Sequence, residues 1–439
     1  MRKFAIVSLG ISLLLAIALL VSARDESLNE DVSRSLQKPI VAAEKNVYLP
    51  LVNFVSPINK DGTELHFTEN ILSACDKERG GLIDCIVQNR SQIEKMLSDN
   101  QTLLDRYQAF LNYTQFSQPL LNEGESTPIP FVDLQRVKLA LWAKSILLIK
   151  DGKAAEGLDL LHRDTQFWRM LLTQSDNLLT HMVAVTLLRK QYELLSRIVA
   201  EFPQMAAAEK NKLLQMIAPL SIQELSFRRA LAGELQLVAH ALTQLDQTNS
   251  CADSSGKDCT NATAAANWSL TNPMWRKTPL YRHNATLNLQ AGLLEQWAGF
   301  SELPATKIAK QKESFSQSLE KEYKPTTGSG MRVYNYIGKQ FVATGFADVS
   351  AYFLKAHDLN GLLRLINLQI QITSLGLPDE RIGPFLQTSD SEFTNPYTGE
   401  AMIWDAKERT LSFPAQGRKD AGEIAVMLGK SVLRAQDKH

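Results

Sequence analysis

Charged side chains gather on two predicted helices of this 439-residue chain: Asp164 and Arg169 on the first, and Glu224, Arg228 and Arg229 on the second. If the two helix faces meet in the fold, these residues form a buried polar cluster or a ligand cleft. The simpler interpretation is that they form interhelical salt bridges on exposed faces. Because charged helix faces are usually exposed, we favour the salt bridges.

A second group of residues combines aromatic and basic side chains in one polar loop: Trp268, Trp275, Arg276, Tyr281, Arg282 and His283. Aromatic rings next to positive charges suit the binding of a sugar or an anionic polymer. They also suit a structural role, in which large side chains fix a long loop to the helices. We favour the structural role and keep the ligand surface as the alternative.

Recognised catalytic motifs are absent from the sequence. There is no G-x-S-x-G or H-E-x-x-H string, and the S-x-x-K string at Ser318–Lys321 lacks the accompanying S-D-N and K-T-G strings. The glycine spacing around Gly330–Lys339 does not fit a phosphate-binding loop. We therefore assign no catalytic residue, no metal ligand and no cofactor, which favours a protein that is not an enzyme.

The four cysteines form two closely spaced pairs, Cys75 with Cys85 and Cys251 with Cys259. Close pairs of this kind favour disulfides in an oxidising compartment, and free buried thiols are the alternative. A zinc site is disfavoured because the chain has no C-x-x-C spacing.

The N-terminus carries a targeting signal. Arg2 and Lys3 precede an uninterrupted apolar run, Phe4–Leu20, which is followed by Val21-Ser22-Ala23. The small residues fit cleavage by signal peptidase after Ala23, but about 20 apolar residues also suffice to cross a bilayer. Residues 1–23 are thus a signal peptide, or a membrane anchor through residues 4–23. In both cases the positive charge holds the N-terminus in the cytoplasm and the remainder is exported.

The elements that must position these residues centre on a helical core between 131 and 202. An apolar stripe recurs at helical spacing along the middle helix: Leu158, Leu161, Thr165, Trp168 and Leu172. Short turns separate this helix from its neighbours on either side, which predicts three antiparallel helices. The spacing is partly that of a tetratricopeptide unit, but the pattern fails at Asp164 and Arg169, and no second copy follows.

The remaining chain divides by composition. The predicted regions are a linker at 24–64, an N-terminal helical region at 65–245, a polar loop with a Cys pair at 246–285, a C-terminal helical region at 286–376, and a β-hairpin with a terminal helix at 377–439. Within them we expect one helix from Gln92 to Phe116, and a capping box at Ser221–Glu224 that opens a long helix to Leu245. Gly233 inside that helix weakens it by roughly 1 kcal/mol relative to Ala. A later helix, 338–375, is interrupted near 345–348, and the terminal helix covers 421–433.

Several strings resemble an uncharacterised family of secreted or inner-membrane helical proteins from proteobacteria. They are Asn284-Ala285-Thr286-Leu287-Asn288, Asn335-Tyr336-Ile337-Gly338-Lys339, the run from His357 to Leu365, Asn395-Pro396-Tyr397-Thr398-Gly399 and Trp404-Asp405. The resemblance extends back over the central helices. It implies a location in the bacterial envelope. It does not indicate any activity.

The sequence therefore predicts a mainly α protein, an irregular antiparallel helical array with a small C-terminal β-hairpin. Acidic and basic residues balance at 47 each, so the charge gives no reason to expect nucleic-acid binding. We expect a periplasmic scaffold that binds an envelope protein and is anchored to the inner membrane or released by cleavage. The alternative is an envelope enzyme or binding protein for cell-wall sugar or lipid. In that alternative the loop from Trp268 to His283 is the lid, and a pocket beneath it, lined by carboxylates of perturbed pKa, would favour it.

Overall fold

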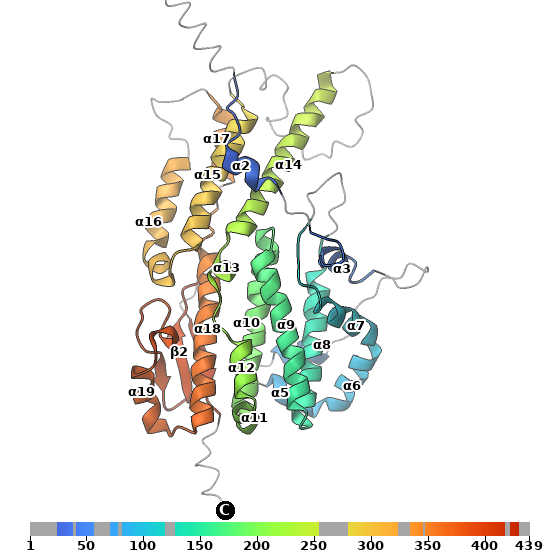
Figure 1. Ribbon diagram of the computed structural model, residues 1–439, viewed down its shortest axis with the longest axis vertical. Helices are drawn as coiled ribbons and strands as arrows, with labels where there is room; N and C mark the ends of the chain where they lie inside the picture. The colour runs from blue at the N-terminus through green and yellow to red at the C-terminus, as the bar shows by residue number, and fades with distance from the viewer. Residues whose placement is uncertain are drawn as a thin grey trace, which may run out of the picture.

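The computed structural model describes residues 24–37, 41–56, 71–77, 81–118, 128–253, 280–323, 334–345, 347–417 and 422–429. These residues form an elongated helical body with one small antiparallel sheet (Figure 1). The helices α2, α14, α15 and α17 lie at one end of the long axis, and the sheet and α19 lie at the other. The predicted fold class, mainly α with a small C-terminal β element, is confirmed.

The three central helices are α8 (Phe131–Lys150), α9 (Ala154–Gln174) and α10 (Leu178–Glu201), antiparallel as predicted. Every residue of the predicted stripe on α9 is buried. Gly152, with a φ of 79°, makes the tight turn between α8 and α9. The Asn177 side chain accepts the N–H of Thr180 and caps α10, so local signals fix both turns.

The chain before α8 contains more short helices than expected. They are α2 (Glu30–Ser35), α3 (Tyr48–Val52), α4 (Ile71–Lys77), α5 (Leu82–Gln88), α6 (Arg90–Asp99) and α7 (Gln101–Phe110). The single helix predicted from Gln92 to Phe116 is wrong, because it breaks at Asn100, whose side-chain amide donates to the Met96 carbonyl. The predicted linker at 24–64 is also wrong as a region without structure, since it holds α2 and α3.

After α10 follow α11 (Pro203–Ala208), α12 (Lys210–Met216), α13 (Ile222–Leu225) and α14 (Arg228–Asp253). The capping box is confirmed, because Ser221 accepts the Glu224 N–H and Glu224 accepts the Ser221 N–H. The helix it opens ends after four residues, however. The long helix begins only at Arg228, once the chain has buried Phe227 between the rings of His181 and Phe353.

The second half consists of α15 (His283–Ser301), α16 (Ala305–Tyr323), α17 (Tyr336–Thr344) and α18 (Ser350–Leu375). The predicted break near 345–348 is confirmed by the interval between α17 and α18. The predicted polar loop at 246–285 is shorter than expected, since α14 continues to Asp253 and α15 begins at His283. Residues 254–279 lie outside the described part of the chain.

Near the C-terminus lie α19 (Asp379–Gln387), η4 (Ser391–Phe393), β1 (Ile403–Asp405), β2 (Thr410–Pro414) and β3 (Glu423–Met427). The strands pair antiparallel in the order β1-β2-β3, with Trp404 opposite Leu411. The predicted hairpin is confirmed. The predicted terminal helix over 421–433 is wrong, because 423–427 alternates between exposed and buried side chains and forms the third strand, with Ile424 and Val426 inward.

Contacts with α18 fix the sheet to the helices. Asp358, fully buried on α18, accepts hydrogen bonds from the Tyr397 hydroxyl at 2.6 Å and from the N–H groups of Gln416 and Gly417 at 3.0 and 2.9 Å. Gln369, eleven residues on, donates to the carbonyls of Ser196 and Met427. The same helix therefore holds α10 on one side and the sheet on another.

Helix propensity predicts that Gly233 weakens its helix, but the structure gives this glycine a stabilising role in packing. A Cβ atom at this position would lie 1.6 Å from the carbonyl oxygen of Asp176, just before α10. The glycine thus allows α14 to cross the start of α10 in backbone contact. The sequence identified the weak helix former but not its packing role.

We predict that Gly233→Ala lowers the free energy of unfolding by about 1–3 kcal/mol, the usual range for overpacking. The matched control is Gly299→Ala on α15, where a Cβ atom meets nothing within 4 Å. This change should raise stability by up to about 1 kcal/mol. Urea denaturation of both variants measures the effect, and equal stabilisation by both would contradict the packing role.

Candidate functional site

Asp164 belongs to a buried polar cluster in the central helices. Lys138 on α8 is ion-paired with Asp164 and donates to the Gln191 side chain on α10 at 2.7 Å. The Tyr107 hydroxyl donates to Asp164 at 2.6 Å and accepts from Trp168 at 2.8 Å. Burial lowers the pKa of Lys138 to about 8, against the raising effect of Asp164. Since Lys138 and Asp164 are both at most 1% exposed, the cluster is closed to solvent and joins the central helices in the core.

The sequence did not identify Lys138, Tyr107 or Gln191 as partners of Asp164. A signal was present for Lys138, which lies four residues after buried Leu134 and three before buried Leu141. A charged residue on an apolar stripe needs a buried partner. The interpretation of Asp164 as part of an exposed salt bridge is therefore wrong.

Arg169 and Glu224 do meet, and they join α9 to α13. The guanidinium donates to both carboxylate oxygens at 2.5 and 2.8 Å and also to the carbonyls of Ala218 and Pro219. Burial opposes ionisation of Glu224, but the hydrogen bonds from Arg169 and Ser221 outweigh it and lower the Glu224 pKa. With side chains 18% and 9% exposed, this ion pair is mostly buried rather than exposed as predicted.

A cleft of about 560 Å³ lies between α2, α14 and α15. Its floor is apolar and comes from all three helices: Val32, Leu231, Ala232, Leu235, Ala291, Leu294 and Ala298. Polar side chains surround the floor: Asn29, Asp31, Arg34, Ser35, Arg228, Asn288 and Glu295. The volume lies within the range of about 300–1,000 Å³ typical of ligand pockets. Arg228 thus contributes to a cleft, as the sequence allowed, although Asp164 and Arg169 do not line it.

Arg228, in the wall of the cleft, is paired with two glutamates. Arg228 donates to both oxygens of Glu295 at 2.5 and 2.7 Å and to both oxygens of Glu302 at 2.9 and 3.0 Å. These hydrogen bonds raise the pKa of Arg228, and those from Arg228 lower the pKa of Glu302. Glu302 does not line the cleft itself, and its carboxylate, with a lowered pKa, is a poor proton donor at neutral pH that holds Arg228 in place at the cleft wall.

Arg229, the last member of the predicted charged group, lies away from this cleft. Its guanidinium donates to Asp176 at 2.8 Å and to the Phe116 carbonyl at 3.1 Å. It therefore ties the start of α14 to the start of α10 and to the chain after α7.

The described members of the predicted aromatic and basic surface are packed at the start of α15. Arg282 is 8% exposed, and its N–H donates to the Asn335 side chain at 3.0 Å. Tyr281 packs against a small apolar cluster centred on Val32, Leu235, Leu242 and Leu287. This arrangement fits the structural role that we favoured. His283 is the first residue of α15, and Trp268, Trp275 and Arg276 lie outside the described residues.

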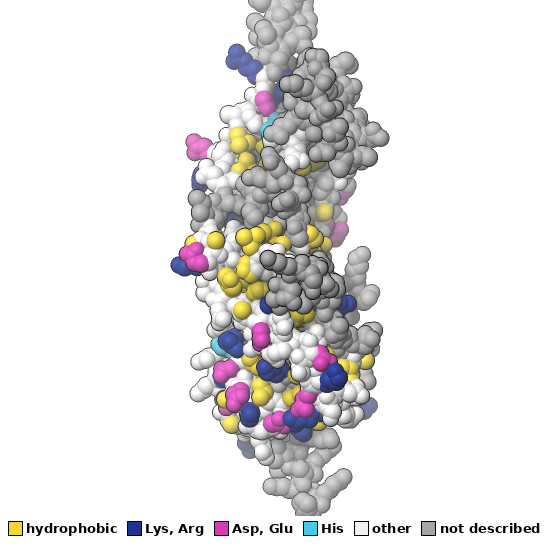
Figure 2. All heavy atoms as spheres, turned by 90° about the vertical axis from the view of Figure 1, so that its right-hand side faces the viewer, with side chains coloured by type: hydrophobic (Ala, Val, Ile, Leu, Met, Phe, Trp, Pro, Cys, Tyr) yellow, Lys and Arg dark blue, Asp and Glu magenta, His cyan; other side chains and the backbone are white. Residues whose placement is uncertain are grey.

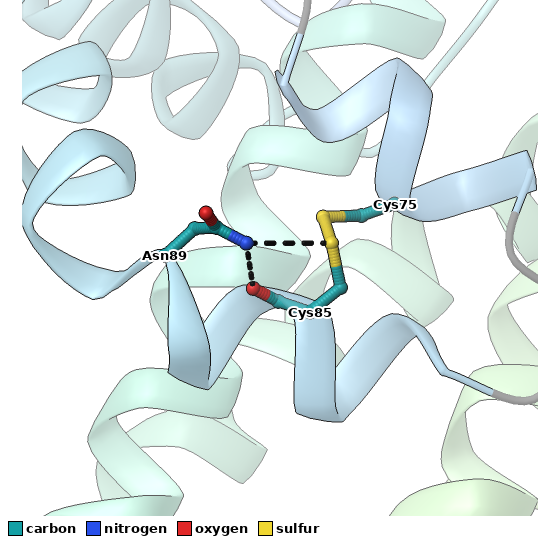
Figure 3. Close-up of a disulfide and its surroundings, with 3 residues drawn as sticks. All are labelled: Cys75, Cys85 and Asn89. Carbon is teal, nitrogen blue, oxygen red and sulfur yellow. Dashed lines mark hydrogen bonds between the residues drawn. A yellow bond between two sulfur atoms is a disulfide. The ribbon is translucent and has the colours of Figure 1, made fainter.

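The predicted disulfide between Cys75 and Cys85 is present and joins α4 to α5 (Figure 3). Asn89 donates to the Cys85 carbonyl at 2.8 Å and closes the end of α5. The second predicted pair, Cys251 with Cys259, lies outside the part whose side chains are described.

No protein-family model, curated protein or solved structure matches this chain. In the ranges that the structure describes, no three His, Cys, Asp or Glu side chains are grouped so that they could hold a metal ion. None of the described helices combines the length and apolar character needed to cross a membrane, and the predicted segment 4–23 lies outside them. Function must therefore be argued from the cleft itself.

Two buried histidines lie away from the cleft and stay neutral. His181 on α10 packs against Phe227, with ring centroids 4.1 Å apart, and burial lowers its pKa to about 3. His357 on α18 has its pKa lowered to about 4, by burial and then by the charge of Arg364. Neither imidazole is poised to exchange a proton near neutral pH.

These histidines predict a loss of stability in acid. The unfolded chain protonates His181 near its ordinary pKa of 6.5, whereas the folded protein does not, so stability falls as pH drops from about 6.5 toward 3. At pH 5 the expected cost of this one group is about 2 kcal/mol. Thermal unfolding at pH 7 and pH 5 measures it. In the His181→Gln variant, the difference in stability between pH 7 and pH 5 should be smaller than in the original protein. An unchanged difference would contradict the role of the buried, neutral His181.

Proposed function

We propose that the protein is a non-enzymatic binding protein of the bacterial envelope, and that the cleft between α2, α14 and α15 receives a segment of a partner protein. The cleft carries this proposal, since an apolar floor inside a charged rim is the usual composition of a protein interface. An amphipathic helix suits such a site, because its apolar side would lie on a floor to which both α14 (Leu231, Leu235) and α15 (Ala291, Leu294) contribute.

The surface charge agrees with a protein partner better than with a polyanion. On the long face shown in Figure 2, basic and acidic side chains are interspersed, and apolar side chains gather at mid-height. Within the rim, Arg228 is shared by two glutamates, so the described ion pairs leave no excess positive charge there. A polyanion would need clustered, unpaired basic side chains.

The proposed location has two supports. The apolar run at 4–20 after Arg2 and Lys3 directs the chain into or across a membrane. The Cys75–Cys85 disulfide is the kind of bond that persists in an oxidising compartment such as the periplasm. In the alternative, the protein binds cell-wall sugar or lipid in the same cleft. Only the volume of the cleft, about 560 Å³, favours this alternative.

We predict that filling the cleft blocks partner binding. A photo-crosslinking residue at Ser35, on the rim, should capture a partner polypeptide in intact cells. Adding Ala232→Trp should reduce that capture at least tenfold, because the indole occupies the apolar floor. Ala155→Trp, at an exposed position on α9, is the matched control and should leave capture unchanged.

Circular dichroism of both tryptophan variants confirms that each is folded. Capture that resists Ala232→Trp would contradict the proposed site. Crosslinks to lipid or glycan instead of polypeptide would favour the alternative ligand class.

A further inference from the structure

The chain segment directly after the predicted membrane segment is fixed to α15. The Asp25 carboxylate accepts the backbone N–H groups of Asn284 at 2.9 Å and Ala285 at 3.1 Å. These groups belong to the first turn of α15, where backbone N–H groups have no partner within the helix. A negative charge is favoured there by the helix dipole. Asp25 therefore caps α15 from about 260 residues away in the sequence.

The next four residues continue this attachment along α15. The Asn284 side chain donates to the Glu26 carbonyl at 2.9 Å, and the Asn288 side chain donates to the Ser27 carbonyl at 3.0 Å. The Asn288 side-chain oxygen in turn accepts the Asn29 N–H at 3.0 Å. Residues 25–29, which we call the N-terminal strap, thus lie along the first two turns of α15 and are hydrogen-bonded to them.

The strap continues into α2, which forms one wall of the cleft. Val32 enters the small apolar cluster with Leu235 and Leu287, and the Ser35 carbonyl accepts from the Gln236 side chain at 2.7 Å. Each end of the strap and α2 is therefore bonded to the α14–α15 pair.

We infer that the amino end of α15 is the membrane-facing end of the protein and that the strap holds it at the bilayer surface. This rests on the proposed export, and it adds that residues 4–23 are retained as an anchor. The apolar run from Phe4 to Leu20 is longer than the 7–15 residues typical of a cleaved signal sequence and approaches the length that crosses a bilayer. Only Arg24 separates Ala23 from Asp25, so the chain spans at most about 7 Å between these two residues.

With the start of α15 at the membrane, the shape of the protein fixes which other elements lie near the bilayer and which lie far from it. Tyr336 on α17 is 36% exposed and lies beside the start of α15, where the Ile337 N–H donates to the Leu280 carbonyl at 2.8 Å. Tyrosine is favoured at membrane interfaces. The sheet lies at the far end of the long axis (Figure 1), and Met427 on β3 is 63% exposed there. The cleft borders the strap. A partner segment that binds in the cleft would therefore lie near the bilayer.

Energy transfer to the membrane tests this orientation. The full-length protein is reconstituted in lipid vesicles that contain an acceptor dye on the headgroups, and a fluorescent amino acid replaces either Tyr336 or Met427. Transfer should be severalfold stronger from position 336 than from 427. The double variant Asp25→Ala/Asn288→Ala, which removes the cap and the side-chain contacts of Asn288 with the strap, should weaken transfer from 336 and reduce the contrast. Asp99→Ala on α6, which removes an exposed ion pair with Lys95 away from the strap and the cleft, should leave the contrast unchanged.

Equal transfer from both positions in vesicle-bound protein would overturn the orientation and leave the proposed cleft function standing. Recovery from cells of a soluble protein that begins at Arg24 would overturn the anchor, and the inference with it. Failure of the cleft crosslink, with the contrast between 336 and 427 intact, would instead count against the proposed function.

Discussion

The burial of α18 on most of its sides is the constraint on which the rest of the structure depends. This helix packs against α10, α11 and α12, against α15 and α16, and against β2 and β3. A helix covered so completely can carry polar groups only if each finds a partner. Asp358 meets this requirement with three donors, and Gln369 donates to carbonyls of two different elements. The polar groups of α18 therefore specify which surfaces may cover it.

An aromatic cluster extends this constraint to the end that holds the cleft. Phe353 near the start of α18 contacts Phe227 and Trp297, with ring centroids 4.7 and 5.9 Å apart, and Phe300 stacks on Phe315 at 4.1 Å. These rings connect α18 with α15, α16 and the chain that enters α14. Since α14 and α15 form two walls of the cleft, its shape is set by packing far from its opening. The third wall is α2, which the N-terminal strap holds in place.

Local signals in the sequence sufficed for much of the fold. The 3.6-residue period predicted α8, α9 and α10, the capping box marked Ser221 correctly, and a β-hairpin was predicted within 377–439. Each of these signals acts between residues close in sequence. The third strand was missed because its alternation covers only five residues, too few to distinguish a strand from a helix with one weak apolar side.

The candidate site could be predicted only in part, because it depends on contacts between distant segments. Arg228 was identified as a candidate, but its partners Glu295 and Glu302 lie about 70 residues away and carried no sequence signal. The wall formed by α2 was interpreted as a linker, since a six-residue helix is not stable alone and forms here by packing Val32 against α14 and α15. Gly233 departs from helix propensity and Lys138 departs from the apolar stripe of its helix, and both departures can be seen in the sequence. The sequence does not show their causes, which are the backbone contact of Gly233 with Asp176 and the buried ion pair of Lys138 with Asp164.

Hydrogen exchange of the full-length protein, followed by mass spectrometry of peptides, tests the central role of α18 most directly. If α18 organises the body, its amides between Asp358 and Gln369 exchange only through global unfolding, together with those of α10 and α15, and more slowly than those of α2 and α19. Exchange of the α18 amides ahead of those in α8, α9 and α10 would contradict the account, because the central helices would then form a core that does not need α18.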